Sequence, residues 1–380
     1  MTDSIESPKE PRLRYPRRQM LRGMLRLFGR AMGALAMRTQ ITGRENLPLK
    51  GPLILVGNHI AVVEAGLMAT YTPYPLEIMA AGDIPLDPRY GWMANLWGII
   101  PIKRGSMDRG GMNKALDVLS QGGVVGLFPE GGIWETTLRQ ARQGVAWLSN
   151  KGQAPIVPIG FGGIEGALAQ IMRFRRPRLT MNIGKLIPPV RVDVPGRSRK
   201  ELLQEGADYI MDRITELIPE DERRIRSQPY IGETFDFKWE LSTPGGVQIA
   251  IPGDVDIVDK HGLSKLFHRP VMMDVFNRNL KLPVKPLVRL RRAHTPLEIA
   301  ASARVILAWL VDNPYFFHYR FGQEEGEAMM KGLSQLEQSA QWLGEHYPNT
   351  LLRLKPIRRY ILLDTNEEVV EDAPPEMQEM

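Results

Sequence analysis

Short apolar runs alternate with helical patterns between about residues 40 and 218, and this alternation restricts the fold more than any other feature of the chain. The predicted strands are Leu53–Val56, Leu76–Ala80, Val124–Phe128, Ile156–Ile159 and Leu179–Ile183. The predicted helices are Met112–Ser120, Leu138–Asn150 and Lys200–Leu217. Strands that alternate with helices pack as layers, so we predict an α/β domain at residues 40–220.

The chain changes character after residue 219. The segment TFDFKWEL alternates apolar and polar residues, and TPGG then leads into VQIAIP, which predicts a β-hairpin. Thr295, Pro296 and Glu298 form the start of a capped helix, and a second helix is expected from Glu325 to about Leu343. The predicted appended parts are an α+β domain of unknown role at residues 230–365 and an acidic tail at 366–380.

The segment before the α/β domain is strongly basic, with eight arginines and no acidic residue between residues 12 and 38. We predict that residues 1–39 comprise a disordered start and an amphipathic helix from Arg18 to Leu35. Four arginines form a stripe on this helix at intervals of four: Arg18, Arg22, Arg26 and Arg30. Either the apolar face packs on the domain and the arginines are solvated, or the helix lies in a membrane interface where the arginines meet lipid phosphates.

The two interpretations are compatible if the helix docks on the domain and presents its rim to lipid. The use of arginine in place of a Lys/Glu mixture favours the interpretation that the helix contacts a membrane. No apolar run approaches the ~20 residues that a spanning helix needs, and the N-terminus lacks the apolar core of a signal peptide. We therefore expect a peripheral protein on the cytoplasmic face of a membrane. The stripe lacks interleaved aromatics, which disfavours nucleic acid as the partner.

His59 and Glu64 follow directly after an apolar run, in the segment VGNHIAVVEAG. The chain contains no cysteine, and the other five histidines lie beyond residue 260, so a metal site is disfavoured here. A catalytic role requires the chain to turn after His59, a turn that Asn58 would shape. Glu64, at a helix start, would then face the imidazole and leave its other nitrogen as a general base. From the pair alone, a structural core histidine and a catalytic histidine both remain open.

Two further segments place charge at the end of an apolar run. GIIPIKRG ends in Lys103 and Arg104, which suit a phosphate, although a solvated strand end has the same pattern. VVGLFPEGG runs into Glu130 and Gly131, at a position where α/β proteins place ligands, although a plain turn with an exposed Glu130 has this pattern too. The glycines would allow backbone amides to approach an anion.

The order of these segments resembles the glycerolipid acyltransferase superfamily, which includes glycerol-3-phosphate and lysophospholipid acyltransferases. The resemblance covers about residues 20–217 and comprises a His-x4-acid box, a G-x-x-P-x-x-R box, an F-P-E-G box and a V-P-I box. It implies a mixed sheet flanked by helices, with the N-terminal amphipathic helix and the appended α+β region added to it. It also implies transfer of a fatty acyl group from acyl-CoA or acyl-carrier protein, as co-substrate, to a hydroxyl of a phosphate-bearing glycerolipid. Neither a metal nor another cofactor is expected.

Carried over by position, His59 matches the catalytic histidine, and Glu64 stands where the family usually has aspartate. Arg104 matches the arginine of the phosphate-binding box, with Lys103 beside it as a second phosphate ligand, and Glu130 with the amides near Gly131 matches the acceptor-binding box. Further departures from the family are Ala61, where serine is common, and Gly132, where threonine or serine is frequent.

These departures leave an alternative, a non-catalytic lipid-binding or membrane-binding protein that keeps the fold. A hydrolase is disfavoured, because the chain has no G-x-S-x-G elbow and Ser106 follows a basic box.

Overall fold

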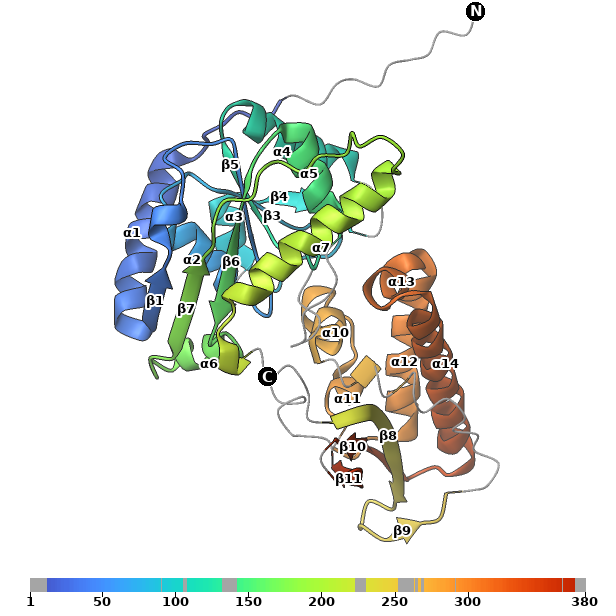
Figure 1. Ribbon diagram of the computed structural model, residues 1–380. Helices are drawn as coiled ribbons and strands as arrows, with labels where there is room; N and C mark the ends of the chain where they lie inside the picture. Colours follow the sequence, from blue (N-terminus) through green and yellow to red (C-terminus); the bar gives the residue numbers. More distant parts are fainter. Residues whose placement is uncertain are drawn as a thin grey trace, which may run out of the picture. The chain divides into compact units, whose positions relative to one another are not determined.

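The chain divides into two units in the computed structural model (Figure 1). The first comprises Met1–Asp83 and Arg89–Ser227, and the second comprises Ile84–Pro88 and Gln228–Met380. The structure describes residues 12–89, 91–104, 108–131, 142–222, 230–251, 263, 266–267, 270–290, 292–363 and 365–372. Most of the predicted disordered start and much of the predicted acidic tail therefore lie outside the described residues, as do Ser106 and Gly132.

A seven-stranded sheet forms the centre of the first unit, in the order β1-β7-β6-β2-β5-β3-β4. Its strands are β1 (Arg38–Thr42), β2 (Leu53–Gly57), β3 (Glu77–Ala81), β4 (Ile100–Ile102), β5 (Val124–Leu127), β6 (Ile156–Gly162) and β7 (Arg178–Ile183). All neighbouring strands are parallel except β6 and β7, which pair antiparallel. The predicted mixed α/β fold is confirmed.

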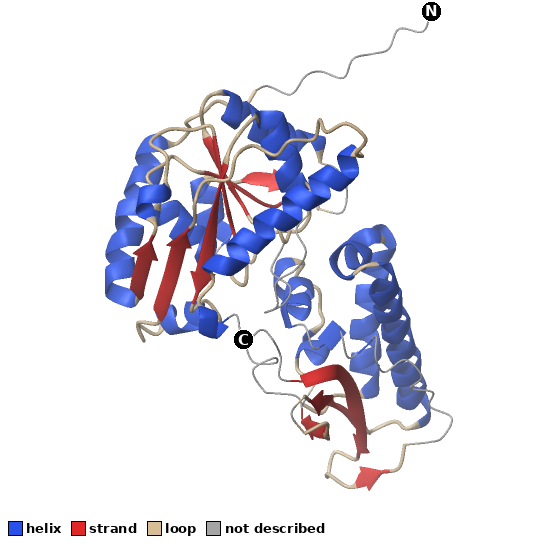
Figure 2. Ribbon diagram, in the orientation of Figure 1, coloured by secondary structure: helices blue, strands red, loops and turns tan. Residues whose placement is uncertain are grey.

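Helices cover both faces of this sheet (Figure 2). They are α1 (Gln19–Ala36), α2 (Val63–Tyr71), α3 (Gly91–Trp97), α4 (Arg109–Ser120), α5 (Gly144–Gly152), α6 (Ala167–Met172) and α7 (Arg199–Leu217). The side chains of β2 alternate between two cores: Leu53 and Leu55 pack with α2, while Ile54 and Val56 pack with α4, α5 and α7. All four side chains are fully buried, as expected for a central strand with both faces covered.

The second unit combines an antiparallel sheet with helices. The sheet has the order β11-β10-β8-β9, with β8 (Tyr230–Ser242), β9 (Gln248–Ile249), β10 (Leu351–Leu362) and β11 (Glu368–Asp372). The helices are α10 (Pro270–Asp274), the π-helix η2 (Val275–Asn279), α11 (Lys285–Val288), α12 (Pro296–Asp312), α13 (Tyr315–Phe321) and α14 (Gln323–His346). The predicted hairpin corresponds to β8 and β9, and the predicted capping box is present at Thr295 and Glu298.

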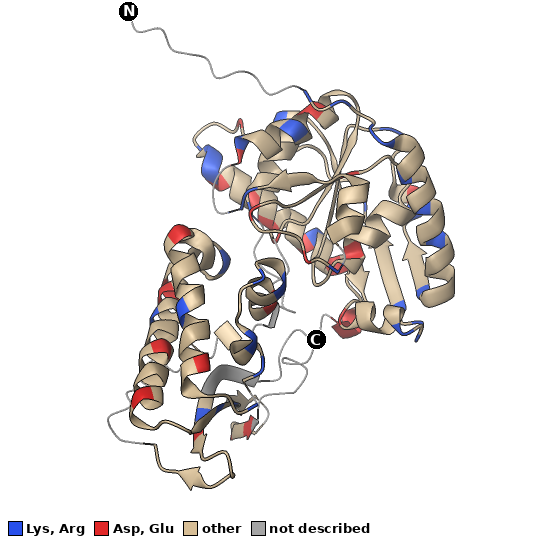
Figure 3. Cartoon of the chain, turned by 180° about the vertical axis from the view of Figure 1, so that it is seen from behind, with Lys and Arg blue, Asp and Glu red and all other residues tan. Residues whose placement is uncertain are grey.

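Helix α1 matches the predicted range, but its faces are used in the opposite sense from the first interpretation. Arg22 is 1% exposed, whereas Met20, Met24 and Leu27 are 85%, 68% and 72% exposed. Basic positions follow this helix, which contains no acidic residue (Figure 3). The helix therefore docks through its arginine face, most deeply at Arg22, and leaves much of its apolar face uncovered, which corrects the interpretation that the apolar face packs on the domain while the arginines are solvated.

Hydrogen bonds explain why an arginine face can be buried. Arg22 makes two bonds to the buried carboxylate of Glu77 on β3, at 2.7 and 2.8 Å, and donates from Nε to the Trp97 carbonyl at 2.9 Å. Arg18 and Arg30 donate to carbonyls at the ends of α3 and α2, and Arg26 does so at Thr72, the C-cap of α2. Cations at helix C-termini satisfy the last carbonyls and oppose the negative end of the helix dipole.

Candidate active site

Four neighbouring parallel strands end at the same edge of the sheet, and each is followed by one polar residue of the site. His59 follows β2, Glu130 follows β5, Asp83 follows β3 and Arg104 follows β4. Because β2, β5, β3 and β4 are adjacent in that order, their carboxyl ends bring together residues that are up to 71 positions apart in the chain. The carboxyl edge of parallel strands is where open α/β sheets bind ligands.

The imidazole of His59 lies against the ring of Phe128, with a centroid distance of 4.1 Å and an interplanar angle of 13°. Its Nδ1 is buried without a hydrogen-bond partner, and it lies 3.9 Å from Oε1 of Glu64. That separation is too long for a hydrogen bond but places the carboxylate beside the ring nitrogen. The His59 side chain as a whole is 16% exposed, so part of the ring faces solvent.

Glu64 is fully buried in the first turn of α2, where its carboxylate holds the turn that precedes the helix. Oε1 accepts the backbone amides of Ile60 and Ala61, at 2.5 and 2.9 Å. Burial raises the pKa of Glu64 to about 7, although these backbone hydrogen bonds favour the ionised form. Glu64 therefore fixes the loop that carries His59 and changes its charge near neutral pH.

Burial and, to a smaller extent, the positive charge of Arg104 lower the pKa of His59 to about 3. The imidazole is therefore neutral at physiological pH. A neutral imidazole can accept a proton, which is the state that a general base requires.

Arg104 is held by Asp83 in a two-point ion pair, with Nε–Oδ1 at 2.7 Å and Nη2–Oδ2 at 3.1 Å. Its Nη1 lies 3.4 Å from the carbonyl oxygen of Gly131. Lys103 is exposed, its backbone amide donates to Asp108, and none of its described contacts joins its side chain to Arg104. The structure thus brings Arg104 to His59 and leaves Lys103 on the surface.

Glu130 and Gly131 form hydrogen bonds with the protein's own backbone in this structure. Glu130 is 5% exposed, and its Oε1 accepts the backbone amide of His59 at 2.9 Å. Gly131 has a φ of 77°, which favours glycine, and its amide donates to the Phe128 carbonyl at 3.1 Å. The backbone amide of Gly131, which was predicted to bind the acyl acceptor, therefore already donates a hydrogen bond to Phe128. The turn instead aligns Glu130 with the backbone of His59.

Two positioning residues received no site role from the sequence. Asn58 is fully buried and exchanges two hydrogen bonds with the backbone of Phe161, at 2.8 and 3.1 Å, so its side chain extends the β2–β6 pairing by one residue. The sequence assigned Asn58 only to a turn, and it did not identify Asp83. The signal in both cases was a polar residue just beyond a predicted apolar strand.

Comparison with known proteins identifies an acyltransferase domain in this chain. Residues 38–162 match the Acyltransferase family model. The chain is 31% identical over 93 residues to a 1-acyl-sn-glycerol-3-phosphate acyltransferase of Borreliella burgdorferi, a match that spans 24% of this chain and 37% of that protein. It is 22% identical over 179 residues to the Bacillus subtilis enzyme of the same name, spanning 47% of this chain and 87% of that one.

The crystal structure of the 1-acyl-sn-glycerophosphate acyltransferase PlsC from Thermotoga maritima aligns with a TM-score of 0.38 and 17% identity, covering 51% of this chain and 80% of that one. Residues 38–162 thus form an acyltransferase domain of the kind found in the glycerolipid acyltransferase superfamily.

Proposed function

We propose that this protein transfers a fatty acyl group from acyl-CoA or acyl-carrier protein to a hydroxyl of a phosphate-bearing glycerolipid, of the lysophospholipid or glycerol-phosphate type. The observation that carries this proposal is the neutral imidazole of His59, with Glu64 beside Nδ1 and the Arg104 guanidinium close enough to affect its pKa. The names of the relatives support the acceptor class, since they act on 1-acylglycerol-3-phosphate.

The chemical step follows from the two ring nitrogens. Nδ1 of His59 faces Glu64, so Nε2 is the atom that would take the proton from the acceptor hydroxyl. The hydroxyl oxygen then attacks the thioester carbonyl carbon, a C–O bond forms and the C–S bond breaks. His59 returns the proton to the departing thiolate. Glu64 stabilises the imidazolium while it exists, and holding donor and acceptor together supplies much of the rate.

Arg104 would bind the acceptor phosphate. Its side chain is 9% exposed and its guanidinium is already paired with Asp83, so an arriving phosphate must share the guanidinium with Asp83 or displace it. A phosphate at Arg104 would also offset the positive charge that lowers the pKa of His59, although burial remains the larger cause. The acceptor would therefore strengthen the base that activates it.

The uncovered apolar face of α1 supports membrane attachment of the protein. Met24, Leu27 and Phe28 are more than 60% exposed on a helix that already docks through Arg22. Among the described residues, no helix is both long and apolar enough to cross a bilayer. We therefore propose peripheral attachment, with the apolar residues of α1 in the interface where lipid substrates reside.

The function is tested by acyl transfer with the purified full chain, labelled acyl-CoA and acyl-carrier protein donors, and acceptors from glycerol 3-phosphate to lysophospholipids. His59→Ala should abolish transfer, whereas His346→Ala, an exposed histidine in the second unit, should not. Transfer by His59→Ala at the wild-type rate would contradict the mechanism. If no donor and acceptor react while vesicle binding persists, the protein is a lipid-binding member that has kept the fold.

A further inference from the structure

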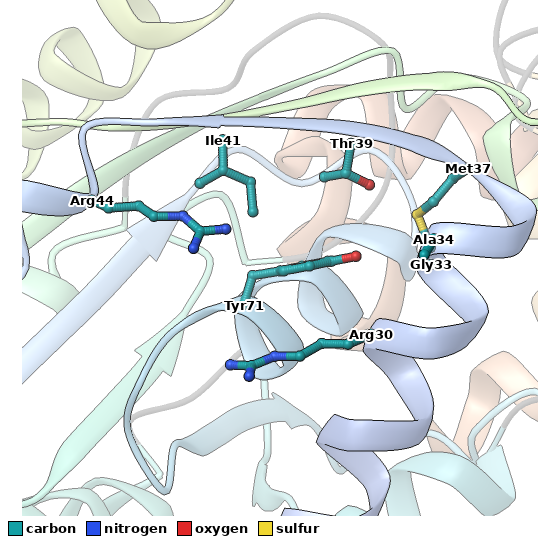
Figure 4. A pocket seen from close by; sticks show the side chains of 8 residues that line it. All are labelled: Arg30, Gly33, Ala34, Met37, Thr39, Ile41, Arg44 and Tyr71. Carbon is teal, nitrogen blue, oxygen red and sulfur yellow. The ribbon is translucent and has the colours of Figure 1, made fainter.

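A pocket lies at the end of α2 farthest from the active site. It has a volume of about 490 Å³, and residues of α1, β1 and α2 line it (Figure 4). Tyr71, the last residue of α2, forms one wall, while Glu64 is the second residue of the same helix. The pocket is therefore displaced by roughly 10 Å along the helix axis from the catalytic carboxylate. It does not share a lining residue with the cluster around His59.

The charge of this pocket is positive. Arg30 and Arg44 line it, and no acidic residue does. Arg30 uses only Nε, which donates to the Thr70 carbonyl at 3.2 Å, while Arg44 is exposed and its side chain forms no hydrogen bond or ion pair with the described residues. Figure 4 shows both guanidinium groups at the same end of the pocket, with the Tyr71 ring between them. Two arginines that line one pocket without a carboxylate suit a phosphate group.

The other end of the pocket contains hydroxyl groups and apolar atoms. The hydroxyl of Tyr71 points toward Gly33 and Met37, and a Cβ at Gly33 would collide with it. Oγ1 of Thr39 is buried and has no hydrogen-bond partner within the described structure. A buried hydroxyl without a partner destabilises the fold, so a ligand that offers it a hydrogen bond would gain affinity.

The pocket adjoins the apolar face of α1. Leu27, Arg30 and Ala34 lie at helical spacings of three and four, so they follow one another along the same side of the helix. Leu27 is 72% exposed, and both Arg30 and Ala34 line the pocket. Phosphate-binding groups thus continue directly into exposed apolar surface, which is the order of polarity in a membrane phospholipid.

We propose that this pocket binds the phosphate of an anionic phospholipid in the membrane, whose acyl chains lie in the bilayer beside α1. The lipid would be an anchor and not a substrate, because its site lies at the opposite end of α2 from His59. The inference rests on the membrane attachment proposed above and adds selectivity for anionic head groups to it. Two arginines near a membrane surface contribute together roughly thirtyfold in affinity.

The test is sedimentation of the full chain with phosphatidylcholine vesicles, with and without phosphatidic acid. Wild type should bind both and prefer the anionic vesicles by roughly thirtyfold. The double change Arg30→Gln with Arg44→Gln should remove that preference. The control, Arg191→Gln with Arg199→Gln, removes the same charge from exposed positions outside the pocket and should keep most of it.

A third variant distinguishes binding in the pocket from attraction by diffuse surface charge. Ala34→Trp keeps every arginine and adds apolar surface, but its indole fills the pocket, so the preference for phosphatidic acid should fall while binding to phosphatidylcholine persists. An unchanged preference in Ala34→Trp would overturn the proposal. Full competition by inorganic phosphate would overturn it too, by showing a site for free phosphate. Acyl transfer to a water-soluble acceptor is measured in parallel, so loss of anchoring and loss of catalysis are distinguished.

Discussion

Oε1 of Glu64 lies 3.9 Å from Nδ1 of His59 and at the same time accepts the backbone amides of Ile60 and Ala61. One oxygen atom therefore shapes the loop that carries the histidine and faces Nδ1, the ring nitrogen opposite the one that would take the proton during the reaction. Catalytic hydrogen bonds are often long before substrate binds and shorten when charge develops. We expect the Glu64–His59 contact to shorten when the imidazolium forms.

This arrangement predicts a pH-dependent role for Glu64. Below about pH 7 the carboxylate becomes protonated and no longer stabilises the imidazolium, so kcat/KM should rise with pH through the neutral range. Glu64→Gln should lower kcat/KM roughly a hundredfold, the low end for general acid–base assistance, and should remove that neutral pH step. The measurement is kcat/KM against pH, with the exposed Glu205→Gln on α7 as the control. A neutral step that survives in Glu64→Gln would assign the titration to another group.

The same residue predicts an unusual dependence of stability on pH. The pKa of Glu64 is raised from 4.5 when unfolded to about 7 when folded, so the folded state binds the proton more tightly. Its contribution is fully present below pH 4.5 and is lost as the pH rises through 7, in total about 3 kcal/mol. Glu64→Gln does not titrate, so its stability relative to wild type should increase by about that amount between pH 4.5 and pH 8.

Urea unfolding of both proteins at the two pH values measures this change. The comparison cancels the opposite contribution of His59, whose lowered pKa makes the protein more stable as the pH rises from 3 to 6.5. A constant difference between Glu64→Gln and wild type would show that the folded carboxyl titrates at its ordinary pKa.

Burial of the arginine face of α1 predicts which substitutions in that helix destabilise the fold. Arg22→Met leaves the buried carboxylate of Glu77 with Arg17 as its remaining ion-pair partner, so it should cost up to about 3–5 kcal/mol, the range for a broken buried pair. Arg18→Met removes an exposed arginine of the same stripe and should cost less than about 1 kcal/mol. Chemical denaturation of both variants tests the contrast, and equal losses would mean that the helix docks through some other contact.

The sequence predicted five of the seven strands of the first sheet and the helices α1, α4, α5 and α7, because their signals are local, whereas it did not predict β1, β4, α3 or α6. The fully apolar run at Leu53–Val56 is a buried strand, and Thr295 with Glu298 is a capping box. The neighbours of each strand were not predicted, because pairing of β2 with β5 joins segments about 70 residues apart. For that reason the sequence missed Asp83, which has no motif of its own and becomes visible only beside Arg104.

The prediction of which face of α1 is buried was wrong for the same reason, because the partner that decides it is distant in the chain. Helical spacing separates an arginine face from an apolar face, and hydrophobicity alone assigns the apolar face to the core. The decisive partner is Glu77, an acidic residue in β3 that is 55 positions from Arg22 in the chain. A glutamate at the start of a predicted buried strand was the available signal that a cation must pack there.

The ion pair between Asp83 and Arg104 predicts how the proposed acceptor phosphate would be bound. Asp83 competes with an acceptor phosphate for the guanidinium, so Asp83→Asn should lower KM for glycerol 3-phosphate or lysophosphatidate, by roughly tenfold if one charge-assisted hydrogen bond is released. Arg104→Gln should raise the same KM. Neither change should alter KM for monoacylglycerol, which has no phosphate. If Asp83→Asn instead raises KM for the phosphate acceptors, Asp83 holds Arg104 in its binding position, and the carboxylate is part of the acceptor site and not its competitor.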